Sequence, residues 1–112
     1  MATKPTPKPE LSHGTAIEYK AFARHFHPGG AAVLYLFASC SYGTPGFTIF
    51  FQPQGGLAQF DLMETKPQGI EPQIVTYYVA DFTNGQPLAT PPTHVKIRDA
   101  HGNHEVQVKP WQ

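Results

Sequence analysis

The fold class is decided by residues 31–40, AAVLYLFASC, which are apolar on both faces of an extended chain. A strand with one solvated face alternates between apolar and polar residues, whereas a strand covered on both faces is apolar throughout. The run is far too short to cross a bilayer. We therefore predict that these residues form a central strand and the most buried element of the protein.

Working outward, the next segments also have the character of strands. Residues 47–52 and 58–62 alternate in polarity between Gly- and Pro-containing turns, and with the central strand they predict a three-stranded meander. Residues 74–82, IVTYYVADF, are rich in β-branched and aromatic side chains and predict a second central strand. Residues 94–109 predict a final, peripheral hairpin in which Gly102 supplies a positive φ.

The composition favours short strands over helices. The chain has 10 Gly and 12 Pro, and charged residues make up 14% of it, against about 25% in an average soluble domain. About seven strands between turns indicate a single all-β domain over residues 15–112. We predict an antiparallel two-sheet sandwich of immunoglobulin-like size, or a partly closed barrel. The Cys-Trp-Cys spacing of true immunoglobulin domains is missing, so only the architecture is indicated.

Residues 15–26 fit two different periods. Alternation of Ile17 and Tyr19 with Glu18 is typical of a half-buried strand. Thr15 and Glu18 also have the spacing of a capping box, which would begin a helix and give an α+β fold with one helix at 15–26. We favour the strand, because a hairpin is the simplest connection to the central strand that follows.

Charge and cysteine content narrow the classes of partner and compartment. Eight basic and eight acidic residues give zero net charge, which disfavours binding to nucleic acid or to an anionic membrane. Cys40 is the only cysteine, so no intrachain disulfide is possible. Residues 1–14 are rich in Pro and Lys and predict a flexible tail without the apolar core of a signal peptide. We expect no membrane insertion and favour the cytoplasm.

Metal ligation is one hypothesis for the histidines. His25 and His27 are two residues apart, so on a strand they point to one face, and His101 and His104 form a second pair. With His94 they are the candidate ligands for a divalent transition metal. Two ligands rarely suffice, so such a site requires the first and last strands to bring the pairs together. The alternative is that these histidines are simply exposed at turns.

Four aromatic residues are candidates for a partner-binding surface: Tyr42, Tyr77, Tyr78 and Trp111. Tyr77 and Tyr78 are adjacent, so they point to opposite faces of a strand. Either both are covered by opposing layers, or one of them lies at the surface. An exposed aromatic side chain on a β domain can anchor a protein or stack on a sugar ring.

No motif in the sequence specifies a reaction, since it has neither a Gly-rich phosphate loop nor a recognisable nucleophile and base. Our main hypothesis is a non-catalytic interaction module that binds a protein or a glycan through its loops or an exposed strand edge, and a homodimer is plausible. The alternatives are a His-mediated metal- or small-ligand-binding domain and a small enzyme without a recognisable motif. A binding module predicts an apolar patch or free edge, a metal protein predicts clustered imidazoles, and an enzyme predicts a deep pocket.

Overall fold

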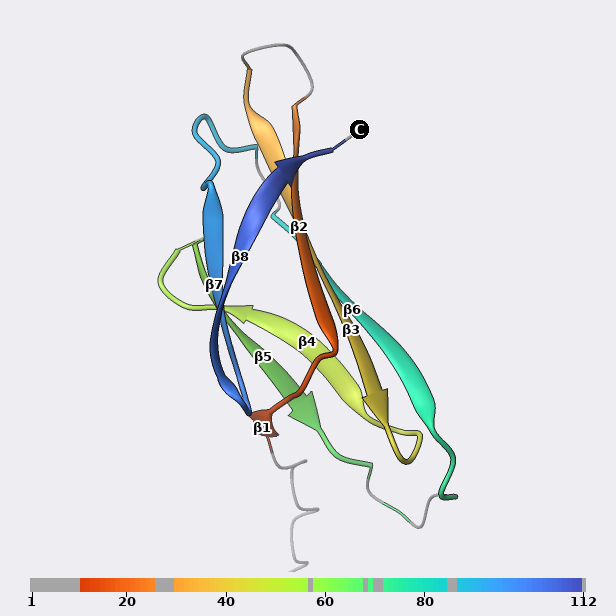
Figure 1. Ribbon diagram of the computed structural model, residues 1–112. Coiled ribbons are helices and arrows are strands. Elements are labelled where there is room, and N and C mark those ends of the chain that lie inside the picture. Colours follow the sequence, from red (N-terminus) through yellow and green to blue (C-terminus); the bar gives the residue numbers. More distant parts are fainter. Residues whose placement is uncertain are drawn as a thin grey trace, which may run out of the picture.

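The structure is a computed structural model that describes residues 11–25, 30–56, 58–67, 69, 72–84 and 87–111. In this part of the chain all the regular secondary structure is strand (Figure 1). The strands are β1 (Leu11–His13), β2 (Glu18–His25), β3 (Ala32–Tyr42), β4 (Thr48–Pro53), β5 (Gln59–Thr65), β6 (Thr76–Thr83), β7 (His94–Asp99) and β8 (Gly102–Pro110). The predicted all-β fold class is therefore confirmed.

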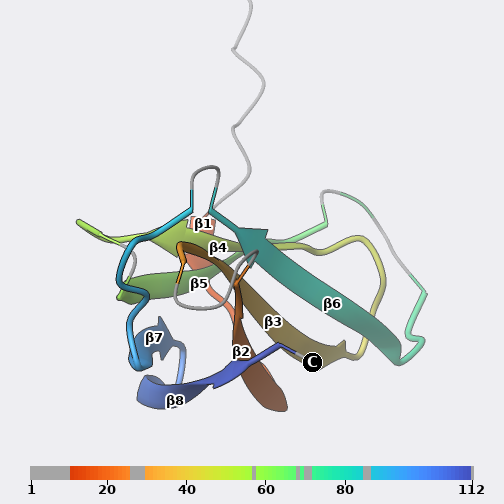
Figure 2. The same ribbon diagram turned by 90° about the horizontal axis from the view of Figure 1, so that it is seen from above.

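The strands form one mixed sheet that curls around a core. The order is β1-β5-β7-β8-β2-β3-β6, and β4 pairs with β5. Seen from above, β4 and β5 form one wall, β2, β3 and β6 form the facing wall, and β7 and β8 connect the two on one side (Figure 2). A two-sheet sandwich is not confirmed. The predicted antiparallel sheet is wrong, because β2 pairs with β8, and β5 with β7, in parallel.

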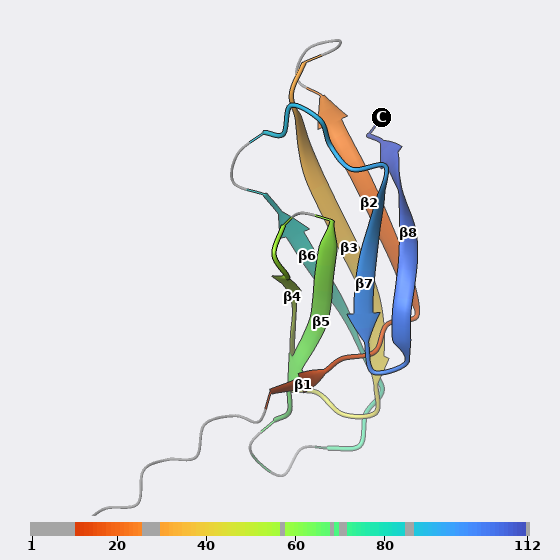
Figure 3. The ribbon, with the colours of Figure 1, turned by 90° about the vertical axis from the view of Figure 1, so that its left-hand side faces the viewer.

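Two predicted strand positions are also wrong. The β7–β8 hairpin is not peripheral, because both of its outer edges form parallel pairs, with β5 and β2. Residues 74–82 do not form a central strand, because β6 pairs along one side only, with β3, among the described residues. β3 itself lies between β2 and β6, as predicted for residues 31–40. The side view shows β7 and β8 in front of the wall that contains β3 (Figure 3).

The predicted meander is only half correct. β4 and β5 form an antiparallel hairpin, but the neighbours of β3 are β2 and β6, so β3 and β4 are not paired. The turn from β3 to β4 instead carries the chain across to the facing wall. The β7–β8 turn forms as predicted, with Asp99 opposite Gly102 and a φ of 119° at Gly102.

The N-terminal segments resolve as strands. Residues 18–25 pair with β3 over their whole length, so the helix at 15–26 is wrong. The antiparallel pairing begins at Glu18 opposite Ser39 and ends at His25 opposite Ala32. The last four residues of the predicted tail are described, and three of them form β1 against β5. None of the described residues belongs to a helix that could span a membrane.

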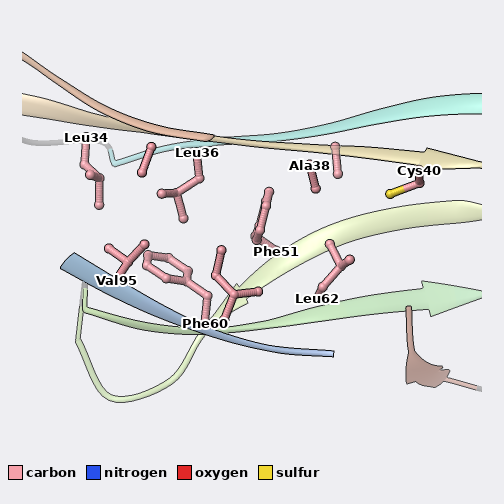
Figure 4. Close-up of a cluster of buried hydrophobic side chains, with 11 residues drawn as sticks. Leu34, Leu36, Ala38, Cys40, Phe51, Phe60, Leu62 and Val95 are labelled. Carbon is pink, nitrogen blue, oxygen red and sulfur yellow. The ribbon is translucent and has the colours of Figure 1, made fainter. Parts of the chain in front are cut away.

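The core lies between the two walls of the curled sheet. Leu34, Leu36 and Ala38 of β3 are fully buried and face Phe60 and Leu62 of β5 (Figure 4). The Phe60 ring is tilted steeply against two other rings, 6.3 Å from Phe51 of β4 and 4.9 Å from Phe82 of β6 between centroids. β4 and β6 belong to different walls and are not paired by backbone hydrogen bonds. The packing around Phe60 therefore holds the two walls together on this side.

Candidate binding surface

The most distinctive surface of the described structure is the outer side of β6 and the two residues before it. Four large apolar side chains are exposed here: Tyr77 (76%), Val79 (71%), Val75 (62%) and Ile74 (58%). We call these four residues the β6 apolar row. Alternation explains the pattern, because Tyr77 and Val79 point outward while the adjacent Ala80 points into the core and is buried.

Two contacts beyond the end of the β3–β6 pairing show which backbone groups of β3 point toward β6. Ala32 and Leu88 exchange two hydrogen bonds, with N···O distances of 2.8 and 2.7 Å. The Leu34 N–H group donates to Asn84 Oδ1 at 2.6 Å, and Asn84 directly follows β6. The N–H groups of these even-numbered β3 residues therefore point toward the β6 side.

The same alternation determines which β6 groups face away from β3. In the continuous antiparallel register even-numbered residues lie opposite even-numbered residues, for example Ala38 opposite Ala80. Backbone groups alternate in direction along a strand. The N–H and C=O groups of Tyr77, Val79 and Asp81 therefore point toward the edge at which the described residues place no pairing strand. Tyr77 and Val79, whose apolar side chains are exposed, thus also direct their backbone groups to this edge. β4 lies near β6 but does not pair with it.

Two of the predicted partner-binding tyrosines, Tyr42 and Tyr78, are half-buried and make contacts within the fold. Tyr42 stacks on Phe47 with ring centroids 4.3 Å apart, and its hydroxyl oxygen accepts a hydrogen bond from the Thr15 N–H group at 3.0 Å. The Tyr78 hydroxyl oxygen accepts a hydrogen bond from the Phe47 N–H group at 3.2 Å. These contacts stabilise the β3–β4 turn. Tyr77 is therefore the tyrosine of the adjacent pair that lies at the surface.

Trp111 packs on the outer face of β2 and β3. Its ring centroid lies 5.3 Å from that of Phe22, 5.0 Å from that of Tyr35 and 6.2 Å from that of Phe37. The backbone N–H group of Trp111 donates to the carbonyl oxygen of Ala23 at 3.0 Å, which continues the parallel β2–β8 pairing. Trp111 is 41% exposed, so it partly covers the other three rings and still presents part of its own.

The structure separates the candidate histidine ligands. β2 and β8 lie side by side, but in parallel, with Ala21 opposite Val108. His25 ends β2, where its Nδ1 atom lies 2.9 Å from Gly30 O, whereas His101 and His104 lie at or near the start of β8. His25 is therefore at the opposite end of the β2–β8 ladder from His101 and His104.

The other two candidate ligands are His94 and His27. His94 begins β7 and lies opposite Gln107, and His27 lies outside the described residues. Across the described ranges, no group of three His, Cys, Asp or Glu side chains could hold a metal ion. The metal hypothesis thus finds no support in this part of the chain.

One polar network was not anticipated from the sequence. The Asp99 side chain is 1% exposed and accepts a hydrogen bond from the Tyr19 hydroxyl at 2.6 Å. It also accepts from the His101 N–H group at 2.8 Å and lies 2.9 Å from His104 Nε2. The His101 contact fixes the turn after β7, whereas the bond to Tyr19 joins residues 80 positions apart in the chain.

The network shifts the ionisation of its members. Burial raises the pKa of Asp99, but the hydrogen bonds from Tyr19, His101 and His104 outweigh it and place the pKa below its ordinary value. Burial and the bond to Asp99 raise the pKa of Tyr19. Burial, and then the charges of nearby carboxylates, raise the pKa of Cys40 to about 11. Asp99 is thus held ionised, and Cys40 is held as an unreactive thiol.

A cleft of about 530 Å³ opens beside this network, between β2 and β8. His104 is positioned by Asp99 at its margin, as a catalytic base would be. The described residues that line the cleft include no Ser, Thr or Cys. The arrangement is therefore a positioned imidazole with no Ser, Thr or Cys side chain beside it among the described residues.

The comparisons with known proteins found no matching family model, no matching curated protein and no matching solved structure.

Proposed function

We propose that this protein is a protein-interaction module that binds an extended segment of a partner along the free edge of β6. One observation carries the proposal: Tyr77 and Val79 combine exposed apolar side chains with backbone groups that point away from β3. Strand addition uses both, because the main-chain hydrogen bonds supply affinity and alternate side chains supply specificity.

The β6 edge favours a peptide over a glycan. An extended peptide offers donors and acceptors at the spacing that a strand edge presents, whereas a glycan is held mainly by stacking on exposed aromatic rings. Tyr77 is the single aromatic residue of the β6 apolar row. On the outer face of β2 and β3, the rings of Phe22, Tyr35 and Phe37 are partly covered by Trp111.

The geometry also defines the sequence pattern of the partner. Residues of an added strand that lie opposite Tyr77 and Val79 project onto the same outer face of the sheet as these two side chains. Aromatic and β-branched residues pair favourably there. The expected ligand is therefore an extended peptide with such residues at every second position and without Pro among them.

Substitution of Val79 by Lys tests the proposal. Random peptides displayed on phage are selected against the wild-type protein, and their affinities for the variant are then measured. Because the substitution places a charge in the β6 apolar row, we expect affinity to fall at least tenfold, which corresponds to about 1.4 kcal/mol. The selected peptides should show the alternating pattern.

The matched control is Gln107→Lys, which makes the same change in charge at an exposed position of the interior strand β8. It should leave peptide affinity unchanged. The proposal is overturned if peptides bind both variants equally well. Selection of oligosaccharides from a glycan array, with no peptide bound at β6, would also contradict it and support the glycan alternative.

A further inference from the structure

We infer that the partner strand is β6 of a second copy of this chain, so that the protein forms a two-fold symmetric dimer through its β6 edges. The inference rests on the proposed function, because it uses the same edge. Every copy of the chain carries the same β6 edge, so a partner strand is present wherever the protein is. Two identical edges that pair antiparallel are related by a two-fold axis, and neither β6 edge is left unpaired at the contact.

The backbone limits the possible registers. Tyr77, Val79 and Asp81 direct their N–H and C=O groups outward, so odd-numbered residues of one copy must lie opposite odd-numbered residues of the other. A two-fold axis beside Tyr78 meets this condition. It places Tyr77 opposite Val79 of the second copy, and by symmetry Val79 opposite Tyr77.

Side-chain pairing supports this register. Aromatic and β-branched residues directly opposite each other are among the favourable cross-strand pairs. The two copies together form one continuous apolar cluster from two Tyr77 and two Val79 side chains, each of which is more than two-thirds exposed in the single chain. Pairing therefore partly covers the two most exposed large apolar side chains among the described residues.

Charge is also compatible with the symmetric pair. Asp81 is the only charged residue of β6. With the axis beside Tyr78, Asp81 lies opposite Val75 of the second copy, and the two Asp81 residues are about 20 Å apart along the strands. This distance exceeds the screening length of about 8 Å at physiological salt, so the like charges do not oppose association. An axis at Val79 would instead place Asp81 opposite Tyr77.

The β6 edge also lacks the features that keep edge strands of monomers apart. Such strands typically carry a Lys, a Pro or a bulge that prevents pairing with another copy. Residues 74–80, IVTYYVA, contain no Lys and no Pro, and the β3–β6 register runs without a bulge from Thr76 to Thr83. The segment thus permits the pairing that its apolar row favours.

Disulfide trapping tests the register. Tyr77→Cys and Val79→Cys chains are mixed and oxidised gently; the expected Cα–Cα distance of about 5.5 Å for a directly opposed pair is within the range of a disulfide. We expect a cross-linked heterodimer as the main product. Thr83→Cys mixed with Val79→Cys is the matched control, since Thr83 is also exposed on β6 but lies opposite Gln73. The buried Cys40 of the wild-type chain gives the background.

Light scattering on wild type, Val79→Lys and Gln107→Lys gives the assembly state. The inference predicts a dimer that Val79→Lys converts to a monomer and Gln107→Lys leaves intact. A dimer that survives Val79→Lys, or equal cross-linking in the Thr83 control, overturns it. A wild-type monomer that still binds peptides at β6 overturns the dimer and leaves the proposed function standing. A monomer that binds no peptide overturns both.

Discussion

Replacing Asp99 by Asn is expected to lower the free energy of unfolding by about 3 kcal/mol, because it removes a buried charge that accepts several hydrogen bonds. The carboxylate serves Tyr19, His101 and His104, and these contacts join β2 to the β7–β8 hairpin. An Asn side chain has one accepting oxygen, and its NH₂ group would face a donor. Urea denaturation of both proteins measures the difference.

The same pair of proteins gives the pH dependence. The pKa of Asp99 is lower in the folded protein than in the unfolded chain, so its stabilisation is complete well above the unfolded pKa of about 3.9. That stabilisation is lost as the pH falls from about 5 through the folded pKa. The difference in free energy of unfolding between wild type and Asp99→Asn should therefore become smaller as the pH falls. Glu105→Gln, at an exposed position of β8, is the control, and a difference that becomes larger in acid would contradict the assignment.

Phe60→Ala is expected to be the most destabilising single substitution in the core, at about 4 kcal/mol. Phe60 is 1% exposed and contacts the rings of Phe51 and Phe82, so its removal leaves a cavity between the two walls of the sheet. Tyr77→Ala, which removes an exposed ring of similar size, is the matched control for the monomer. Chemical denaturation at low protein concentration compares the two variants.

A double-mutant cycle tests whether the stability lost at Phe60 comes from its contact with Phe82. Phe60→Leu and Phe82→Leu should be coupled by about 1 kcal/mol, because their rings meet at 4.9 Å from facing walls. Additive effects, or a cost below 1 kcal/mol for Phe60→Ala, would mean that the curled sheet does not close over Phe60. That result would contradict the fold rather than the binding proposal.

Local patterns in the sequence were sufficient to find most of the strands. The unbroken apolar run at 31–40 indicated a central strand covered on both faces. β3 is central, since it is paired along both edges, but its outer face is only partly buried and Ser39 is exposed. The alternation of Glu18 with Ile17 and Tyr19 indicated a strand at β2, where the capping-box spacing also allowed a helix. Strand pairing decided between the two, since β2 is paired on both sides.

Pairing between distant strands could not be predicted in the same way. The parallel contacts of β5 with β7 and of β2 with β8 join segments that are far apart in the chain, and no local period encodes them. For this reason the β7–β8 hairpin was misplaced at the periphery. The run IVTYYVADF indicated a central strand by composition, but one face of it is exposed in the described structure.

The candidate site was only partly visible in the sequence. Tyr77 was among the proposed partner-binding residues, and the structure places it at the surface, whereas Tyr42 and Tyr78 stabilise a turn. Val79 was not singled out, because its exposure depends on the outer face of β6 being left uncovered by the rest of the fold. No sequence motif marks the contact of Asp99 with Tyr19, which requires the three-dimensional fold.

Strand addition is tested most directly by hydrogen exchange of the β6 backbone amides. Exchange is measured in the free chain, with a selected peptide bound, and at protein concentrations high enough for a second copy to bind. The amides of Tyr78 and Ala80 face β3 and should exchange slowly under all conditions. The amides of Tyr77, Val79 and Asp81 should exchange rapidly in the free chain and become protected on binding. Rapid exchange at these three positions when the peptide or second copy is bound would contradict strand addition at β6.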